Sequence, residues 1–363
     1  MDPQVEALLT EQPSRISAYE VAGVSIDEGD RAVALMKQLV DKARRPEVVG
    51  GIGGFVGLFD ATFLQEYNRP LLATSADGVG TKVAIARQLD KHDTIGFDLV
   101  GMLVDDLVVC GAEPLFMTDY IACGKVVPER IAAIVKGIAE ACVVAGCALL
   151  GGETAEHPGL LGPDDYDLAG STTGVVEADA LLGPERVRAG DVLIAMASSG
   201  LHSNGYSLVR EVLLRQAGWA LDRYVEELGR TLGEELLEPT RIYALPCLGL
   251  ARHTDVHAMA HITGGGLATN LARALPRHLS ATVARRTWTP HPIFDLVRDV
   301  GAVQLEDLER TLNLGVGMVA IIAADDADAA VTRLCDAGVS AWTCGEVTPW
   351  RGGEVTLTGA YAG

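Results

Sequence analysis

The pattern of hydrophobic and polar positions divides the first half of the chain into helices and strands. Apolar residues recur every three to four positions across residues 25–42 and again after Pro128, a spacing typical of amphipathic helices. A third helix is predicted over residues 94–110. Short apolar runs predict strands at residues 70–75, 115–123 and 148–150.

The second half repeats this mixture after a turn-rich stretch at residues 183–191. Because each half mixes strands with helices, the predicted fold class is α+β with two domains. We place a loose N-terminal arm at residues 1–16, a first domain at 17–180 and a second domain at 181–363. The elements predicted in the second domain are strands at residues 192–197 and 315–323, a helix from about Tyr206 and a helix over residues 267–275.

Length and charge limit the classes of partner. The chain has 363 residues, enough for two ordinary domains, and a formal net charge of −20. Such an acidic chain is a poor candidate for binding nucleic acid or an anionic membrane, so neither partner is expected. An anionic ligand would need local cations, backbone N–H groups or metal ions to offset this charge.

Cysteine usage and the N-terminal sequence predict a cytoplasmic protein. The seven cysteines are odd in number and none forms a C-x-x-C pair, which disfavours a disulfide framework or a structural zinc site. The N-terminus has neither a basic start nor an apolar core, so no signal peptide is predicted. The most apolar stretch, residues 131–150, is interrupted by Lys136 and Glu140 and is not expected to span a membrane.

Several common enzyme motifs are absent from the sequence. There is no G-x-x-x-x-G-K-[ST] segment, which excludes a P-loop enzyme, and neither H-E-x-x-H nor G-x-S-x-G occurs. The glycine cluster at residues 50–54 lacks the dinucleotide fingerprint, because Val56 stands where its third glycine would be.

The segment Asp77-Gly78-Val79-Gly80-Thr81-Lys82 follows a predicted strand and is the first candidate ligand site. Aspartate supplies the hard oxygen that Mg²⁺ prefers, and two glycines let the backbone approach a phosphate. Lys82 can offset phosphate charge. On spacing alone, an Asp-Gly turn with a solvated lysine explains the segment equally well.

Three aspartates lie on the helix predicted over residues 94–110. Asp98 and Asp105 share a face about 10 Å apart along the helix axis, and Asp106 lies about 100° round from Asp105. Carboxylates among apolar neighbours repel one another, and Mg²⁺ would relieve that repulsion. A solvated acidic face is the alternative, and the Asp77 segment favours the metal.

Further polar groups lie beside predicted strands and helices. Gly152 and Glu153 end the strand predicted at residues 148–150, a common ligand position in α/β folds. His202-Ser203-Asn204-Gly205 precedes a helix, where Ser203 or Asn204 is predicted to cap the helix and could bind an anion. His202 is then a candidate acid, base or phosphate donor. Thr263-Gly264-Gly265-Gly266 also opens a helix and suits a sugar phosphate.

Taken together, these segments resemble the phosphoribosylformylglycinamidine cyclo-ligases, also called aminoimidazole ribonucleotide synthetases. The resemblance runs from about Ser17 to past Met318, most of the chain. The matching segments are residues 44–48, 50–55, 77–82, 92–96, 111–115, 151–156, 202–210 and 261–266.

The resemblance implies an activity in the fifth step of purine synthesis. Formylglycinamidine ribonucleotide and ATP would give aminoimidazole ribonucleotide, ADP and phosphate through an iminophosphate. An amide oxygen leaves poorly, so ATP phosphorylates it, and the substrate's own amine then closes the ring. The family further implies a homodimer whose N-terminal domains contribute strands to a dimeric β-barrel, with an α/β layered second domain covering the cleft.

Roles for individual residues also follow from the resemblance, with ATP and Mg²⁺ as cofactors. His202, Lys37 and Asp106 are the candidate catalytic residues, and Asp77, Asp98 and Asp106 are the candidate metal ligands. The nucleotide is expected at Asp77, Gly78, Gly80, Thr81, Lys82, Gly152 and Glu153. The substrate phosphate is expected at Gly50, Gly51, Gly53, Gly54, Ser203, Asn204, Thr263, Gly264, Gly265 and Gly266.

The chain departs from the family pattern at a few positions. Asp105 stands where Asn is usual, which adds a negative charge beside Asp106 and could alter metal number or affinity. His157 and Leu201 stand where Met and Pro are expected. Neither of these two removes a proposed ligand.

Two kinds of alternative remain open at this point. One is another ATP-using relative: selenophosphate synthetase, thiamine-monophosphate kinase or the amidotransferase that makes this substrate. The first normally carries a reactive cysteine or selenocysteine near its N-terminus, and no cysteine precedes Cys110. The other is a non-catalytic homologue acting as an assembly partner, which the retained Asp77, Lys82, Asp106 and His202 disfavour.

Overall fold

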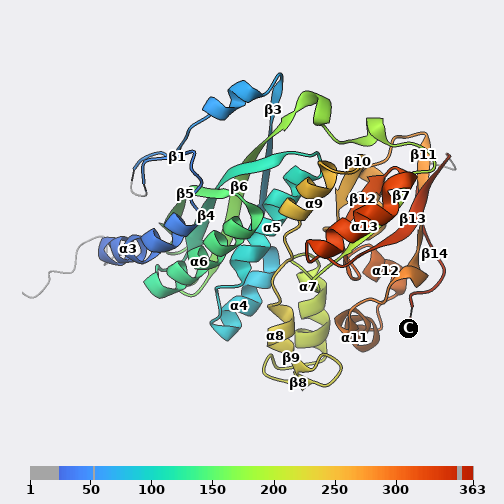
Figure 1. The fold of residues 1–363 in the computed structure, drawn as a ribbon. Coiled ribbons are helices and arrows are strands. Elements are labelled where there is room, and N and C mark those ends of the chain that lie inside the picture. The colour runs from blue at the N-terminus through green and yellow to red at the C-terminus, as the bar shows by residue number, and fades with distance from the viewer. Residues whose placement is uncertain (1–23, 52–53, 350–353, 363) are drawn as a thin grey trace, which may run out of the picture.

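The computed structural model describes residues 24–51, 54–349 and 354–362, so the predicted N-terminal arm and Gly53 lie outside the described residues. Within these ranges, two sheets with their own helices follow one another along the chain (Figure 1). The predicted α+β class is therefore confirmed.

The first sheet has the strand order β3-β6-β4-β5. β6 pairs antiparallel with β3 and with β4, whereas β4 pairs parallel with the edge strand β5. The parallel pair is joined by a helix, as parallel strands require a long crossover. The strands are β3 (Pro70–Gly78), β4 (Glu113–Cys123), β5 (Ala148–Glu156) and β6 (Tyr166–Glu177).

Helices α5 (Ile95–Val108) and α6 (Pro128–Ala145) pack together on one face of this sheet, and α3 (Ile26–Lys42) packs on α6 (Figure 1). Pro128 occupies the first turn of α6, and Gly146 ends it with a left-handed φ of 69°. Nearly all of α5 is buried, because it lies between the first sheet and the second unit.

The opposite face of the first sheet carries no helix in the described part of the chain. Exposed and half-buried residues alternate along β3, and Leu72 is 65% exposed. Tyr120 on β4 is 41% exposed on the same sheet. An antiparallel sheet that buries one face shows this alternation.

The second sheet has the order β10-β12-β7-β13-β11-β14. Its inner strand β12, next to the edge strand β10, is buried at every position, which matches the continuous apolar run in the sequence. The strands are β7 (Val192–Ala197), β10 (Val256–His261), β11 (Leu279–Ala284), β12 (Val316–Ile322), β13 (Ala341–Pro349) and β14 (Val355–Thr358).

Two hydrophobic cores lie on the two faces of this second sheet. Leu193 and Val319 pack with Leu267 and Leu271 of α10 (Gly266–Arg273) in one core. The other core is continuous with α5 and the first unit, which ties the two units together. The other helices and strands are β1 (Val48–Val49), β2 (Leu58–Phe59), α4 (Val83–Leu89), α7 (Tyr206–Val209), a π-helix (Arg210–Gln216), β8 (Tyr224–Val225), β9 (Arg230–Thr231), α8 (Leu232–Leu236), α9 (Ala244–Ala251), α11 (Pro292–Gly301), α12 (Leu305–Glu309) and α13 (Ala327–Asp336).

Two local predictions differ from the structure. β5 continues through Glu156, so Gly152 and Glu153 lie inside a strand, opposite Asp119 and Tyr120 of β4, and not at its end. Helix α7 is preceded by Gly205 with φ 79° and has no side-chain cap, so the prediction of Ser203 or Asn204 as its N-cap is wrong. At both places the contacts of the folded chain, and not the local sequence pattern, decide where the strand or helix begins and ends.

Among the described residues, none of the helices has the length and apolar character that a membrane crossing requires.

Candidate active site

The Asp77 segment lies where the first unit meets the second. Asp77 and Gly78 are the last residues of β3, and Gly80, with φ 74°, starts a 3₁₀ turn (Gly80–Lys82) that leads into α4. Asp77 is exposed, and its Oδ1 accepts a hydrogen bond from the Gly78 N–H at 2.7 Å. The Asp77 carboxylate therefore lies exposed at the end of β3, where the backbone N–H of the next residue donates to it.

A pocket of about 560 Å³ joins this segment to the His202–Gly205 region. Ser203 Oγ donates to the Val79 carbonyl at 2.7 Å, and the Thr81 and Ser207 hydroxyls lie 3.3 Å apart. Asn204 lines the same pocket. Two segments that are more than 100 positions apart thus line one cavity. The nucleotide was expected at the first segment and the substrate phosphate at the second.

The glycine loop of residues 263–266 lies next to Asn204. A Cβ on Gly264 would stand 3.3 Å from Asn204 Oδ1. The buried Asn270 holds the loop, because its Nδ2 donates to the carbonyls of Thr263 and Gly264 at 3.3 Å and of Gly266 at 2.9 Å. Gly266 is required, since its φ is 70° and a Cβ would lie 1.7 Å from the Glu309 carbonyl.

Asp106 lines a different pocket, of about 370 Å³, together with His261 and Arg273. His261 Nδ1 donates to Asp106 Oδ1 at 2.9 Å. Burial by itself lowers the pKa of His261, but the bond to Asp106 and the charges of Asp105 and Asp77 raise it above its ordinary value. This hydrogen bond orients the exposed Asp106 carboxylate.

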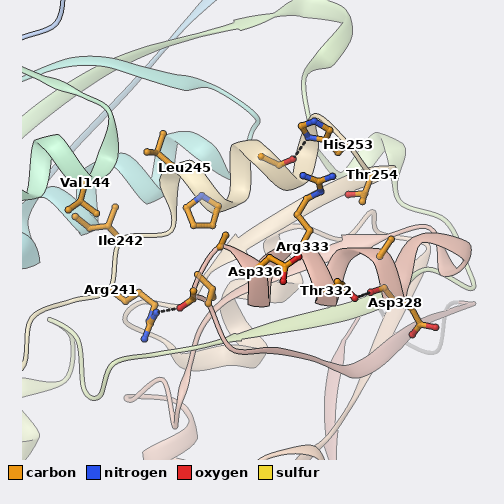
Figure 2. A pocket seen from close by; sticks show the side chains of 16 residues that line it. Val144, Arg241, Ile242, Leu245, His253, Thr254, Asp328, Thr332, Arg333 and Asp336 are labelled. Atoms are coloured by element: carbon orange, nitrogen blue, oxygen red, sulfur yellow. Dashed lines mark hydrogen bonds between the residues drawn. The ribbon is translucent and has the colours of Figure 1, made fainter.

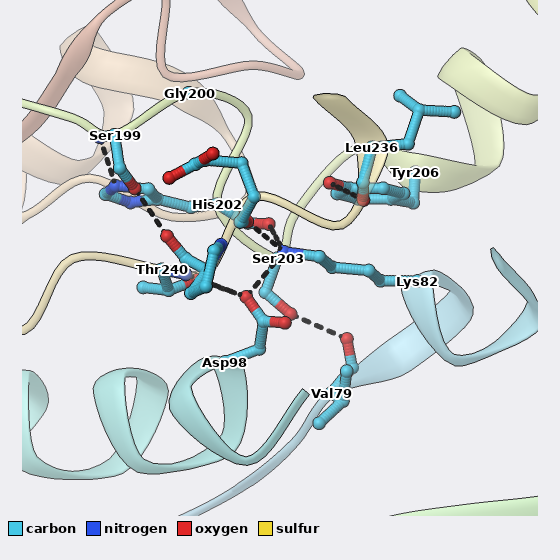
Figure 3. A network of polar contacts seen from close by, with 12 residues as sticks. Val79, Lys82, Asp98, Ser199, Gly200, His202, Ser203, Tyr206, Leu236 and Thr240 are labelled. Carbon is cyan, nitrogen blue, oxygen red and sulfur yellow. Dashed lines mark hydrogen bonds and ion pairs between the residues drawn. The ribbon is translucent and has the colours of Figure 1, made fainter. Parts of the chain in front are cut away.

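Asp98 does not lie in either pocket. Its side chain is fully buried, and its Oδ1 accepts from Lys82 Nζ at 2.7 Å and from the Thr240 N–H and hydroxyl at 3.0 and 2.6 Å (Figure 3). The prediction of Asp98 as a metal ligand is therefore contradicted. A buried ammonium, and not Mg²⁺, neutralises this carboxylate.

Lys82 is equally buried, and its three donors are all used within the protein. Besides Asp98, Nζ donates to the carbonyls of His202 at 2.9 Å and Glu238 at 2.6 Å (Figure 3). Burial lowers the pKa of Lys82, and Asp98 opposes that shift. The prediction that Lys82 offsets phosphate charge is contradicted, because no proton of its ammonium remains for a ligand.

His202 is held by the same network through its backbone carbonyl. Its ring is 2% exposed, and Nε2 accepts from the Ser199 N–H at 3.1 Å. Burial lowers the pKa of His202 well below its ordinary value. Its left-handed φ of 61° is unusual for a residue with a side chain. The ring lines neither pocket, and its Nδ1 has no hydrogen-bond partner among the described residues. The role of His202 in the reaction stays a prediction.

Asp105 is buried on the same helix. Its Oδ1 accepts from the Tyr243 N–H at 2.9 Å, whereas Oδ2 has no hydrogen-bond partner among the described residues. Burial raises the pKa of Asp105 to about 7, although the charge of His261 opposes the shift. The aspartate that replaces the usual asparagine thus points into the protein and not into the pocket of Asp106.

The remaining predicted residues lie elsewhere. Gly50 and Gly51 are exposed just after β1, as is Gly54 beyond Gly53, which lies outside the described residues. Lys37 is exposed on α3. Gly152 and Glu153 line a separate pocket between α3 and the first sheet. The structure does not bring these residues together with Asp77.

The largest pocket, about 960 Å³, contains none of the predicted residues. It lies between α9 and α13, where Arg241, Leu245, Arg333 and Asp336 line it (Figure 2). Two arginines and two aspartates line it, so their formal charges cancel, and its size alone assigns it no function.

Comparison with known proteins identifies the family. The N-terminal domain of AIR synthase related proteins matches residues 60–176, and the C-terminal domain of that group matches residues 188–358. The phosphoribosylformylglycinamidine cyclo-ligase of Geobacillus kaustophilus (strain HTA426) is 51% identical over 342 residues, which cover 94% of this chain and 98% of the relative. The chain belongs to the phosphoribosylformylglycinamidine cyclo-ligase family. A further cyclo-ligase, from Syntrophotalea carbinolica, is 49% identical over 341 residues, which cover 94% of this chain and 97% of the relative.

Solved structures of other families share the fold. Thiamine-monophosphate kinase from Stenotrophomonas maltophilia superposes with a TM-score of 0.65 at 20% identity, covering 91% of this chain and 97% of the kinase. The hydrogenase maturation protein HypE in complex with ATP gives 0.64 at 17% identity, covering 91% and 90%. At these identities the likeness concerns the fold alone, and the sequence relatives decide between the cyclo-ligases and the kinase.

Two site residues of this cyclo-ligase family member were missing from the predicted site. His261 could have been chosen from its position directly before the glycine loop, but its partnership with Asp106 needs the approach of β10 to α5. Asn270 lies four positions after Gly266 on α10. Nothing in the local sequence indicates that an asparagine there holds the glycine loop.

We predict that Lys82→Met destabilises the protein by about 3–5 kcal/mol, because it leaves the Asp98 carboxylate buried without its counter-charge. Chemical denaturation measures the change. The double variant Lys82→Met with Asp98→Asn is expected to lose clearly less than the sum of the two single variants. Additive losses would show that the two side chains do not act as a pair.

We predict that Asp105→Asn retains activity and stabilises the metal-free protein above pH 7. The folded-state pKa of Asp105, about 7, exceeds its ordinary value of 3.8, so the folded state binds the extra proton between these values. The contribution of Asp105 to stability is therefore lost as pH rises through that window. Unfolding titrations with EDTA from pH 4 to 8 should show a variant advantage that grows with pH. A constant difference would contradict the assignment.

Proposed function

We propose that this chain uses ATP to convert formylglycinamidine ribonucleotide to aminoimidazole ribonucleotide, with release of ADP and phosphate, in de novo purine biosynthesis. The observation that carries this function is the identity of about half of all residues to cyclo-ligases over nearly the full length of both chains. The pocket shared by the Asp77 segment and Asn204 supplies a site of suitable chemistry.

The reaction needs a good leaving group on the substrate and a substrate held in the conformation that closes the ring. Phosphorylation of the amide oxygen to an iminophosphate supplies the leaving group, and the amine of the same molecule then closes the ring. Because ring closure is intramolecular, fixing the productive conformer removes much of the barrier. We assign that positioning to the glycine loop at residues 263–266 and to Asn204, which would hold the ribose phosphate through backbone N–H groups and the amide.

Mg²⁺ is proposed as the ion that screens the nucleotide phosphates. No group of three or more His, Cys, Asp or Glu side chains suited to a metal occurs among the described residues. Mg²⁺ commonly binds through one or two carboxylates, with phosphates and waters as the other ligands, so two exposed aspartates suffice. Asp77 and Asp106 fit this requirement, because both are exposed and the charge of each acts on His261.

We also propose that the chain acts as a cytoplasmic homodimer whose interface is the helix-free face of the first sheet. Leu72 and Tyr120 are large and exposed there, and a sheet face that no helix covers can pack on a second sheet face. Two such faces would make the dimeric barrel that the family resemblance implies.

We predict that Asp77→Asn or Asp106→Asn lowers kcat at least about 10²-fold, the scale of one key electrostatic group. The measurement is ATP- and substrate-dependent formation of aminoimidazole ribonucleotide by the purified protein. Asp179→Asn, at an exposed position outside the pockets described above, is the matched control and should keep full activity. Near-normal rates in either site variant would reject the assignment. No product from the unaltered protein would support a non-catalytic homologue.

We predict that Leu72→Glu produces monomers in size-exclusion chromatography with light scattering, because it places a charge on the proposed interface. Tyr224→Glu changes a side chain of similar exposure, 62%, on β8 of the second unit and should leave the oligomeric state unchanged. A dimer that survives Leu72→Glu would place the interface elsewhere.

A further inference from the structure

A short segment of the second unit, residues 309–312, lies behind both loops at which the substrate phosphate is expected. It begins at Glu309, the last residue of α12, and ends at the buried Leu312. A Cβ on Gly266 of the glycine loop would stand 1.7 Å from the Glu309 carbonyl oxygen. At the other end of the segment, a Cβ on Gly205 would stand 2.2 Å from Leu312 Cδ2. The segment therefore touches the backbone of both loops.

These contacts leave little room for the loops to move independently of the segment. Both glycines have a left-handed backbone, with φ of 79° at Gly205 and 70° at Gly266. Asn313, directly after the segment, donates from Nδ2 to the Gly200 carbonyl at 2.9 Å and accepts from Ser198 Oγ at 3.2 Å. Because closely packed groups transmit displacement, a shift of the segment would move both loops.

The segment is itself held by an ion pair between Glu309 and Arg285. Arg285 Nε and Nη2 donate to the two carboxylate oxygens of Glu309 at 2.6 and 2.8 Å, a paired geometry that fixes orientation as well as distance. The Tyr361 hydroxyl donates to the same carboxylate at 2.8 Å. Arg285 Nη1 donates to the carbonyls of Leu357 and Gly359 at 2.9 and 3.1 Å. The pair thus ties α12 to β14 and to the residues that follow it (Figure 1).

This ion pair is shielded from water, unlike most surface pairs. The Arg285 and Glu309 side chains are 16% and 13% exposed. Exposed ion pairs contribute little, whereas a desolvated pair with two parallel hydrogen bonds holds its partners in one arrangement.

The Asp77 segment is held by other groups. Its Lys82 pairs with Asp98 on α5, and its Val79 N–H donates to the Leu168 carbonyl on β6 at 3.2 Å. A disturbance at Glu309 is therefore expected to affect the two substrate loops and to leave the nucleotide segment in place.

We propose that Glu309 is a positioning residue for the substrate, because its bonds with Arg285 and Tyr361 set the spacing of the two loops that hold the ribose phosphate. The inference rests on the proposed function, which supplies a substrate with a phosphate group. A phosphate bound by the backbone N–H groups of two loops needs both loops at one separation. Glu309 lines neither pocket of the candidate site and acts through Gly205 and Gly266.

The first test is the Glu309→Gln variant, whose amide keeps a single acceptor oxygen for two donors. KM for formylglycinamidine ribonucleotide should rise about 10-fold. The kcat value should change less than about 2-fold, since the phosphate does not react and its binding contributes equally to the ground state and the transition state. KM for ATP should stay unchanged.

Leu334→Ala is the control for a general loss of stability. It opens a cavity beneath α13, away from the segment, and should leave both KM values unchanged. An active Glu309→Gln protein with an unaltered KM for the substrate overturns the proposal. So does an equal rise in both KM values, because the effect would then not be confined to the substrate loops.

A second variant, Tyr361→Phe, removes only one hydroxyl group and guards against a folding defect in Glu309→Gln. It should raise KM for the substrate in the same direction by about 3-fold. Because Tyr361 acts through Glu309, adding Tyr361→Phe to Glu309→Gln should raise KM by less than the product of the two single effects. Multiplicative effects would show that the two side chains act separately and would overturn the proposal.

Failure of the proposed function can be told apart from failure of this inference. If the unaltered protein forms no aminoimidazole ribonucleotide, the proposed function fails, and amide hydrogen exchange then tests the positioning alone. In Glu309→Gln, exchange in residues 202–205 and 263–266 should become faster relative to residues 77–82 of the same sample. Leu334→Ala should leave that ratio unaltered. An unaltered ratio in Glu309→Gln rejects the inference.

Discussion

The buried ion pair between Lys82 and Asp98 is the constraint on which the arrangement of the site depends. Lys82 comes at the end of the Asp77 segment, and Asp98 lies on α5 of the same unit. The same ammonium also binds the backbone carbonyls of His202 and Glu238 in the second unit (Figure 3). One buried charge therefore fixes both segments that line the candidate nucleotide pocket. Removing either member leaves a desolvated charge, which is why such a pair specifies a single arrangement.

This network also explains the unusual surroundings of His202. Its carbonyl is held by Lys82, and its ring packs beside Tyr243, 6.1 Å between ring centroids, and over Gly317, where a Cβ would lie 2.6 Å from the ring. The left-handed backbone at His202 turns the chain so that Ser203 and Asn204 face the Asp77 segment. The backbone of His202 thus helps to shape the pocket.

Charges around the pocket are divided between the two faces of α5. Asp98 and Asp105 point toward the segment at residues 240–243 and accept hydrogen bonds from its backbone N–H groups. Asp98 also accepts one from the ammonium of Lys82. Asp106 points the other way and meets His261. A chain with net charge −20 thus keeps Asp77 and Asp106 exposed, and the buried His261 holds the second of them.

The sequence by itself determined the element pattern and the family. Periodicity located α3, α5, α6 and the strands β4, β7 and β12 to within a few residues, since burial of one helix face or of a whole strand leaves a direct signal. The long motifs identified the cyclo-ligases. Asp77 and Asn204 line one pocket and Asp106 lines another, and the roles expected of them stay predictions.

Only the tertiary structure decided which charged residues face a ligand. Asp98, Lys82 and His202 look as suitable in the sequence as Asp77 and Asp106, yet all three are buried against one another. Their burial depends on contacts between positions more than 100 apart, and local spacing carries no information about such contacts. Residue type and motif indicate what a side chain can do, whereas packing decides what remains free to do it.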